Sequence, residues 1–212
     1  PPTLTTVNAY LDKQPYPSEI LVVENGSQDL TAVVAQAFAA DHPRLRVICE
    51  TRRGKGLAVR RGMLEAASEY RFICDADLSM PIEHVAKFLP PQIGPYDVAI
   101  GSREAPGAHR FNEPAYRHLQ GRVFSNLVKW LALPGFEDTQ CGFKCFRAIA
   151  ALDVFQVQQF DGMSFDVEAL FIARKRGYRI VEVPIDWFYR SESRVNPLAD
   201  PLRMLRDILV LR

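Results

Sequence analysis

Asp75 and Asp77 are separated by one residue and follow directly after the apolar run from Arg71 to Cys74. In an extended chain, side chains two residues apart point to the same side, so both carboxylates would face one ligand. Two negative charges that close disfavour one another unless a cation lies between them. Carboxylate oxygens suit Mg²⁺ or Mn²⁺, whose other positions are filled by water and substrate phosphates. The pair therefore predicts a metal site, and the alternative is a solvated turn in which Ser79 caps the following helix.

Polar residues also end two other apolar runs, at Glu24-Asn25-Gly26-Ser27 and at Gly101-Ser102-Arg103. Because open α/β sheets bind ligands beyond the carboxyl ends of their strands, we expect all three polar groups to lie at one edge. The segment RRGKG (52–56) opens a predicted helix. Its glycines, the helix N-terminus and Lys55 favour an anion or a nucleobase carbonyl, and the alternative is a tight turn with solvated basic residues.

Apolar runs and helical repeats predict the elements that would position these residues. The predicted strands are Glu19 to Val23, Arg44 to Cys49, Arg71 to Cys74, Asp97 to Ile100 and Arg179 to Trp187. The predicted helices are Asp29 to Ala40, Gly56 to Ala67, Ile82 to Leu89, Pro114 to Leu133, Ala148 to Gln158, Phe165 to Arg176 and Pro201 to Leu211. This alternation indicates a single α/β domain over 1–212, with a mostly parallel central sheet flanked by helices.

The opening of the chain departs from this pattern, because an amphipathic helix starts at Pro1 and no strand precedes it. We therefore expect the domain to begin before Pro1. The net charge of +1 argues against a polycation that binds nucleic acid. The four cysteines lack the paired spacing of a zinc site, and no run reaches the ~20 apolar residues of a membrane span.

The segments VVENGSQDLT (22–31), GKGLAVRRGM (54–63) and DADL (75–78) follow one another in the first half of the chain. Together they resemble motifs of glycosyltransferase family 2, which has the GT-A fold. GSR (101–103), DTQCGFK (138–144) and FDVE (165–168) resemble more closely the branch of dolichyl-phosphate β-glucosyltransferases and dolichyl-phosphate mannose synthases. The resemblance extends from about Tyr16 to the C-terminus, and DTQCGFK is its most specific motif.

Two departures from the family pattern concern the nucleotide. The family begins with a strand that ends in a Pro-x-Tyr-Asn-Glu-like motif, which is missing from this sequence and agrees with a start before Pro1. Asn25 stands where the family usually has Asp. Asparagine can still hydrogen-bond the edge of a uracil, but it lacks the charge.

The resemblance implies a role for each matched residue. The nucleotide-sugar half, 1–104, is Rossmann-like and would bind the donor through Glu24, Asn25, Gly26, Ser27, Lys55 and Asp75. Asp75 and Asp77 would hold Mg²⁺ or Mn²⁺ on the donor diphosphate. The acceptor half, 105–212, would act together with the strand end at Ser102, and the residues expected to hold the acceptor phosphate are Ser102, Arg103, Arg117 and Arg122.

The catalytic residues implied by the resemblance are Asp138, Arg103 and Arg122. Arginine pairs with phosphate oxygens in two hydrogen bonds, although surface salt bridges are an alternative for Arg117 and Arg122. Asp138 would act as a base, orient the acceptor or cap a turn. A phosphate acceptor is already ionised near neutral pH, so we favour positioning.

The implied function is inverting transfer of a hexose, glucose from UDP-glucose, to a polyprenyl or dolichyl phosphate by a metal-dependent enzyme. One alternative is a family 2 enzyme with a soluble or glycan acceptor. Others are a sugar-nucleotide nucleotidyltransferase and a non-catalytic module that binds nucleotide sugars.

The last predicted helix, Pro201 to Leu211, alternates leucines with arginines. Such a helix can lie at an anionic membrane surface, and the alternative is a helix that packs on its own domain. We expect a cytoplasmic protein, with peripheral contact at the cytoplasmic face of the membrane.

Overall fold

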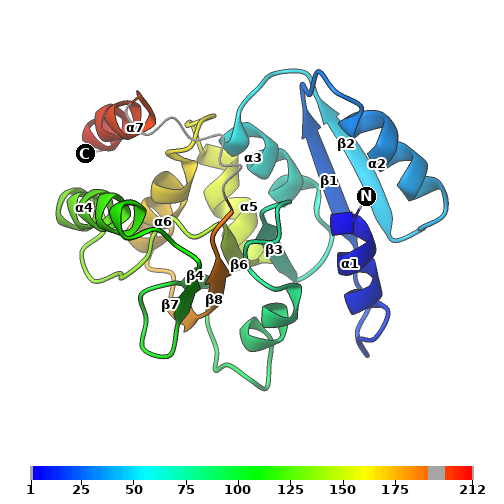
Figure 1. The fold of residues 1–212 in the computed structure, drawn as a ribbon, viewed down its shortest axis with the longest axis horizontal. Helices are drawn as coiled ribbons and strands as arrows, with labels where there is room; N and C mark the ends of the chain where they lie inside the picture. Colours follow the sequence, from blue (N-terminus) through cyan, green and yellow to red (C-terminus); the bar gives the residue numbers. More distant parts are fainter. Residues whose placement is uncertain (1, 191–198, 212) are drawn as a thin grey trace.

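The computed structural model describes residues 2–190 and 199–211, which form three sheets surrounded by helices (Figure 1). β1 (Ile20–Asn25) and β2 (Leu45–Glu50) pair in parallel. The central sheet has the strand order β3-β6-β4-β7. Its strands are β3 (Tyr70–Cys74), β4 (Val98–Ser102), β6 (Phe143–Arg147) and β7 (Ile180–Pro184). A short parallel pair joins β5 (His109–Phe111) to β8 (Asp186–Phe188).

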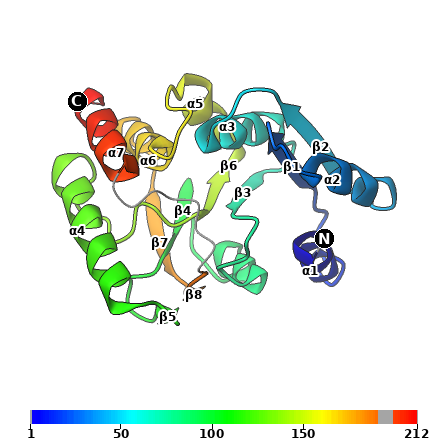
Figure 2. The same cartoon turned by 45° about the horizontal axis from the view of Figure 1, so that its top comes forward.

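The helices occupy the predicted positions. They are α1 (Pro2–Leu11), α2 (Thr31–Ala40), α3 (Lys55–Glu65), the 3-10 helix η1 (Ile82–Phe88), α4 (Ala115–Leu131), α5 (Ala148–Val157), α6 (Phe165–Lys175) and α7 (Ala199–Val210). β1, β2 and α2 lie at one side of the molecule and α4 and α7 at the other, with the central sheet between them (Figures 1 and 2). The predicted α/β class with helices around a sheet is therefore confirmed.

The sequence did not predict β6, which runs antiparallel between β3 and β4. β6 is five residues long and passes directly into α5 at Ala148, so no turn residue marks its end. As a result β6 and β7, from the second half of the chain, share one sheet with β3 and β4. The predicted strand from Arg179 to Trp187 is divided into β7 and β8.

Two apolar clusters lie on opposite faces of this sheet. Val98 and Ile100 of β4 belong to one cluster, and Ala99 between them belongs to the other. β6 alternates in the same way, with Phe146 in the first cluster and Phe143 in the second. All five side chains are fully buried. This two-sided burial fixes the register of the central strands, because a shift by one residue would exchange the two faces.

α7 packs on α4 and buries Met204 and Ile208, while Arg203, Arg206 and Leu209 remain exposed. The structure therefore supports the interpretation that this helix packs on its own domain. Among the described helices, none combines the length and the apolar character needed to span a bilayer.

Candidate functional site

The loop after β1 and the start of α3 are joined by hydrogen bonds. Asn25 donates its side-chain amide to the carbonyl of Gly54, at 2.7 Å, and Arg53 donates to the carbonyl of Gly26 at 3.1 Å. An aspartate at position 25 would have no hydrogen to donate to Gly54, which explains physically why asparagine suits this position. The Oδ1 atom of Asn25 remains an acceptor for a ligand.

The three other residues predicted at 24–27 lie at the end of β1 and in the loop that follows it. The carboxylate of Glu24 accepts the backbone N–H of Ser27, which closes the turn. Gly26 has φ of 72°, a left-handed conformation that favours glycine. The residues predicted at 24–27 are thus brought next to the N-terminus of α3, whose backbone N–H groups favour an anion.

The predicted metal ligands follow β3. Asp75 Oδ1 lies 2.7 Å from the ammonium nitrogen of Lys55. Asp77 is exposed and its Oδ1 accepts the N–H of Ser79 at 2.9 Å. Burial alone would lower the pKa of Lys55, but the charges of Asp75 and Asp166 outweigh it and raise that pKa above its ordinary value.

These residues fit a divalent cation as a partial set of ligands. The ammonium of Lys55 already occupies a cationic position beside Asp75. In the described part of the chain, no group of three or more His, Cys, Asp or Glu side chains is arranged to hold a metal. Asp75 and Asp77 would therefore supply two oxygen ligands, and the others would come from water and phosphates, as is usual for Mg²⁺.

Arg103 and Asp138 form a two-pronged pair at the end of β4. Asp138 Oδ2 accepts Nε of Arg103 at 2.6 Å and its Oδ1 accepts Nη2 at 2.9 Å. The side chain of Asp138 is only 4% exposed. Burial would raise the pKa of Asp138, but the charge and hydrogen bonds of Arg103 outweigh it and bring the pKa to about 2. Asp138 therefore positions Arg103, and its two oxygens are occupied rather than poised to take a proton.

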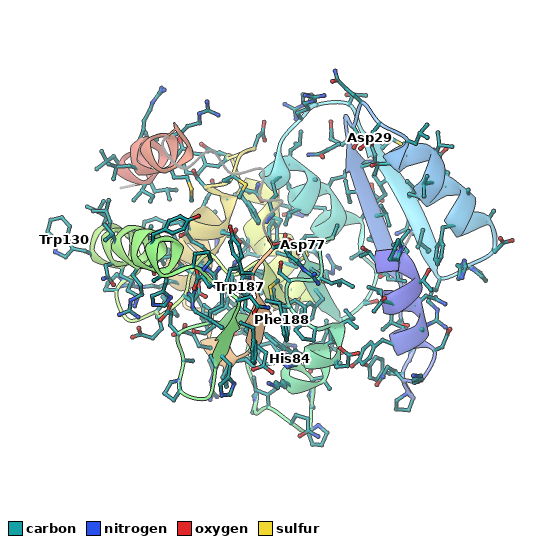
Figure 3. The ribbon with its side chains drawn as sticks, in the orientation of Figure 1. Asp29, Asp77, His84, Trp130, Trp187 and Phe188 are labelled. Atoms are coloured by element: carbon teal, nitrogen blue, oxygen red, sulfur yellow. The ribbon has the colours of Figure 1, made fainter. Side chains whose placement is uncertain are left out.

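A second group of charges extends from Arg103 towards α4. The ring of Trp187 is close to two guanidinium groups, with its centroid 5.5 Å from Cζ of Arg103 and 5.6 Å from Cζ of Arg110. Glu104 pairs with Arg110 at 2.5 Å and with Arg122 at 2.6 Å. Figure 3 shows Trp187 and Asp77 in the central part of the molecule, whereas Trp130 projects from the outer side of α4. The side chain of Arg122 is 45% exposed, so part of its guanidinium group faces solvent beside Glu104.

Two predicted acceptor residues are placed differently. Ser102 is fully buried, and its hydroxyl accepts the N–H of Ala105 at 3.0 Å. This corrects the prediction that Ser102 contacts the acceptor, because the hydroxyl closes the turn after β4 and is out of reach of a ligand. Arg117 lies on α4, but its side chain is outside the part of the chain that the structure describes.

Sequence reasoning assigned no role to Gly142, Lys144 or Asp166, although all three lie in the motifs that carried the resemblance. Lys144 is 1% exposed and its ammonium lies 2.5 Å from Asp166. A Cβ atom on Gly142 would stand 2.0 Å from Asp75 Oδ2, so only glycine leaves room for that carboxylate. Segment 138–144 therefore touches both parts of the site, with Gly142 under Asp75 and Asp138 holding Arg103.

Solved structures that resemble this one share its fold. Glucosyl-3-phosphoglycerate synthase from Mycobacterium tuberculosis in complex with UDP is 18% identical, with a TM-score of 0.64 over 97% of this chain and 73% of that one. The same enzyme in complex with Mg²⁺ and UDP is 16% identical, with a TM-score of 0.65 over 99% of this chain and 72% of that one. At such identity the likeness concerns the fold, and it confirms the predicted GT-A-like architecture.

Curated relatives match almost the whole chain. The dolichyl-phosphate beta-glucosyltransferase of Saccharomyces cerevisiae is 32% identical over 99% of this chain and 69% of its own length. That of Homo sapiens is 32% identical over 96% of this chain and 68% of its own length. A dolichyl-phosphate beta-glucosyltransferase of Trichomonas vaginalis is 32% identical over 98% of this chain and 65% of its own length. The profile of Glycosyl transferase family 2 matches residues 1–153, and the chain belongs to glycosyltransferase family 2.

Proposed function

We propose that this chain is the catalytic part of an inverting hexosyltransferase that moves glucose from UDP-glucose to a dolichyl or other polyprenyl phosphate. The proposal depends on one arrangement, in which segment 138–144 connects a carboxylate pair suited to a cation with arginines suited to a phosphate. The names of relatives 32% identical over nearly the whole chain support glucose and dolichyl phosphate. The fold neighbours, which were solved with UDP or with UDP-glucose and Mn²⁺, support the donor.

The donor would lie between the loop after β1 and the loop after β3. Glu24, Asn25, Gly26 and Ser27 would frame the nucleotide, and Asp75 and Asp77 would hold Mg²⁺ or Mn²⁺ beside its diphosphate. When bound, the cation neutralises charge on the leaving diphosphate. Complexes of the fold neighbour with Mn²⁺ or Mg²⁺ support this assignment.

The acceptor phosphate would meet the arginines beside Trp187. Arg103 is held in place by Asp138, and the more exposed Arg122 can release Glu104 to bind a phosphate oxygen. An ionised phosphate attacks without a base, and attack opposite the leaving diphosphate inverts the anomeric centre. This agrees with the buried, occupied state of Asp138.

We expect Arg122→Ala to raise the acceptor KM roughly ten- to hundredfold, because it removes a charge-assisted hydrogen bond of about 1.5–3 kcal/mol. The affinity for UDP-glucose should stay unchanged. Transfer from UDP-glucose to a polyprenyl phosphate in detergent, with Mn²⁺, measures both. Arg103→Ala is a poorer test, since it also leaves Asp138 buried without a partner.

Arg61→Ala is the matched control, because Arg61 pairs with Glu65 on an exposed face of α3. The acceptor assignment is wrong if UDP-glucose affinity falls as much as acceptor KM rises in Arg122→Ala. The same assay separates the alternatives. Transfer to a soluble phosphorylated compound would indicate another acceptor, pyrophosphate release from a nucleoside triphosphate would indicate a nucleotidyltransferase, and binding without turnover would indicate a non-catalytic module.

Gly142→Ala should weaken Mn²⁺ binding about 10- to 100-fold, as does the loss of a group that orients a metal ligand. The added methyl group would collide with Asp75 and push its carboxylate aside. Titration of Mn²⁺, followed by the EPR signal of the unbound ion, measures the affinity. Gly94→Ala is the control, since a Cβ atom there meets nothing within 4 Å. Equal Mn²⁺ affinities in the two variants would contradict the placement of the cation at Asp75.

Contact with the cytoplasmic face of a membrane belongs to the same proposal, since a polyprenyl acceptor is a lipid. The exposed Arg203, Arg206 and Leu209 of α7 support a peripheral contact, with Met204 and Ile208 keeping the helix on the domain. Such a surface combines basic groups with an apolar side chain, as interfacial helices do.

A further inference from the structure

Asp75 is held on both sides. Its Oδ1 accepts the ammonium of Lys55, with 2.7 Å between Oδ1 and Nζ. Its Oδ2 lies so close to Gly142 that a Cβ atom there would stand 2.0 Å from it. A cation that approaches Oδ1 of Asp75 therefore meets an oxygen that already has a positively charged partner.

Lys55 differs from the second lysine of the site in its freedom to move. Lys144 is buried, and its ammonium is fixed between Asp166 and the carbonyl of Cys141. Lys55 is 30% exposed and begins α3, and Asp75 is its one ion-pair partner among the described residues. An ammonium group on a flexible four-carbon stem can change partners by rotating its own bonds.

We infer that Lys55 takes the place of the divalent cation at Asp75 while the donor is absent, and moves to the donor's diphosphate when the cation arrives. The inference rests on the proposed function, since it requires a nucleoside diphosphate as part of the substrate. Lys55 is thus a positioning residue that makes the binding of cation and nucleotide cooperative.

The physical reason is repulsion at one oxygen. Because Mg²⁺ binds oxygen ligands at about 2.0–2.1 Å, a cation bound to Oδ1 would lie within about 5 Å of an ammonium that stayed in place. A diphosphate relieves this conflict, because it offers the ammonium a new anionic partner and binds the cation as well. Each ligand therefore improves the site for the other, and by linkage the factor is the same in both directions.

The test compares Mn²⁺ and UDP binding in wild type and Lys55→Gln. EPR of unbound Mn²⁺ and calorimetry of UDP give the affinities, corrected for the Mn²⁺–UDP complex in solution. In wild type, UDP should raise Mn²⁺ affinity about tenfold or more, within the usual range of coupling. In Lys55→Gln, Mn²⁺ alone should bind several-fold more tightly because Asp75 has lost its ammonium partner. The coupling factor should fall, though not to one, because cation and diphosphate still touch.

Two further variants complete the experiment, and unfolding curves check that each is folded. Lys13→Gln makes the same change in charge at an exposed position and should match wild type. Lys55→Arg keeps the charge and should keep Mn²⁺ binding weak in the absence of UDP. If Mn²⁺ alone binds Lys55→Gln no more tightly than wild type, the inference is wrong while the proposed function stands. If wild type fails to bind UDP with either cation, the proposed function fails and the inference fails with it.

Discussion

Replacing Asp138 with asparagine should lower the free energy of unfolding by about 3–5 kcal/mol. Removing one partner of a buried ion pair leaves the charge of the other partner uncompensated. Arg103 loses the charge that balances it, at a side chain 22% exposed. Asparagine also presents an amide group where Asp138 now accepts Nε and Nη2 of Arg103. Urea unfolding of wild type and Asp138→Asn measures the difference.

The neighbouring Glu137 provides the control, because it is 54% exposed and pairs with Lys129 on the surface. Glu137→Gln should change stability by no more than about 1 kcal/mol, as exposed pairs do. A role for Asp138 as a catalytic base makes the opposite prediction. Asp138→Asn would then remove turnover and leave the unfolding curve where it was.

The pH dependence of the free energy of unfolding provides a second test of Asp138→Asn. The native pKa of Asp138 is about 2, below the unfolded value of about 3.9. A depressed carboxyl pKa stabilises the fold above the unfolded pKa, and this stabilisation is lost as pH falls towards the native pKa. Wild type should therefore lose this contribution to stability as the pH falls from about 4 to about 2. Asp138→Asn lacks the contribution at every pH, so its stability should not show this loss.

Local sequence patterns were sufficient for the helices and for most strands. The apolar run before Asp75 predicted β3, and the strand end then predicted where its carboxylates lie. The strands predicted to end at Val23 and Ile100 correspond to β1 and β4, which each continue two residues further, to Asn25 and Ser102. These features depend on residues close in the chain, which periodicity and turn chemistry describe well. The expected segment before Pro1 stays a prediction.

Pairings between distant segments were beyond these patterns. Arg103 and Asp138 were both named as site residues, but nothing local shows that Asp138 holds Arg103 across 35 positions. The burial of Ser102 follows from β6 and β7, which lie on either side of β4, and from the turn at Ala105. The motif DTQCGFK (138–144) includes Lys144, but sequence reasoning assigned this lysine no role, because its ion-pair partner Asp166 lies in α6. Tertiary contacts, rather than propensities, decide such features.

Substitution in the carboxylate pair of Asp75 and Asp77 should have the largest effect on activity. Asp77→Asn should lower turnover at least about 100-fold, since a bound metal supplies several kcal/mol of charge stabilisation in the transition state. The fold should remain intact. Asparagine keeps the oxygen that accepts the N–H of Ser79, so the turn after β3 is preserved. Loss of one of two neighbouring negative charges should leave the protein without bound ligands as stable as wild type or slightly more stable.

Calorimetry of UDP with and without Mn²⁺, on wild type and Asp77→Asn, checks the cause of that loss. Mn²⁺ should increase UDP affinity in wild type and have little effect in Asp77→Asn. A turn or cap role for Asp77 predicts lower stability and no link between metal and nucleotide, so equal UDP affinity in all four titrations would contradict a metal-dependent transferase. The direction of the Mn²⁺ effect also separates the two sides of the site. Asp77→Asn should weaken Mn²⁺ binding by removing a ligand, whereas Lys55→Gln should strengthen it by removing a competing cation. Both variants should reduce the coupling to UDP.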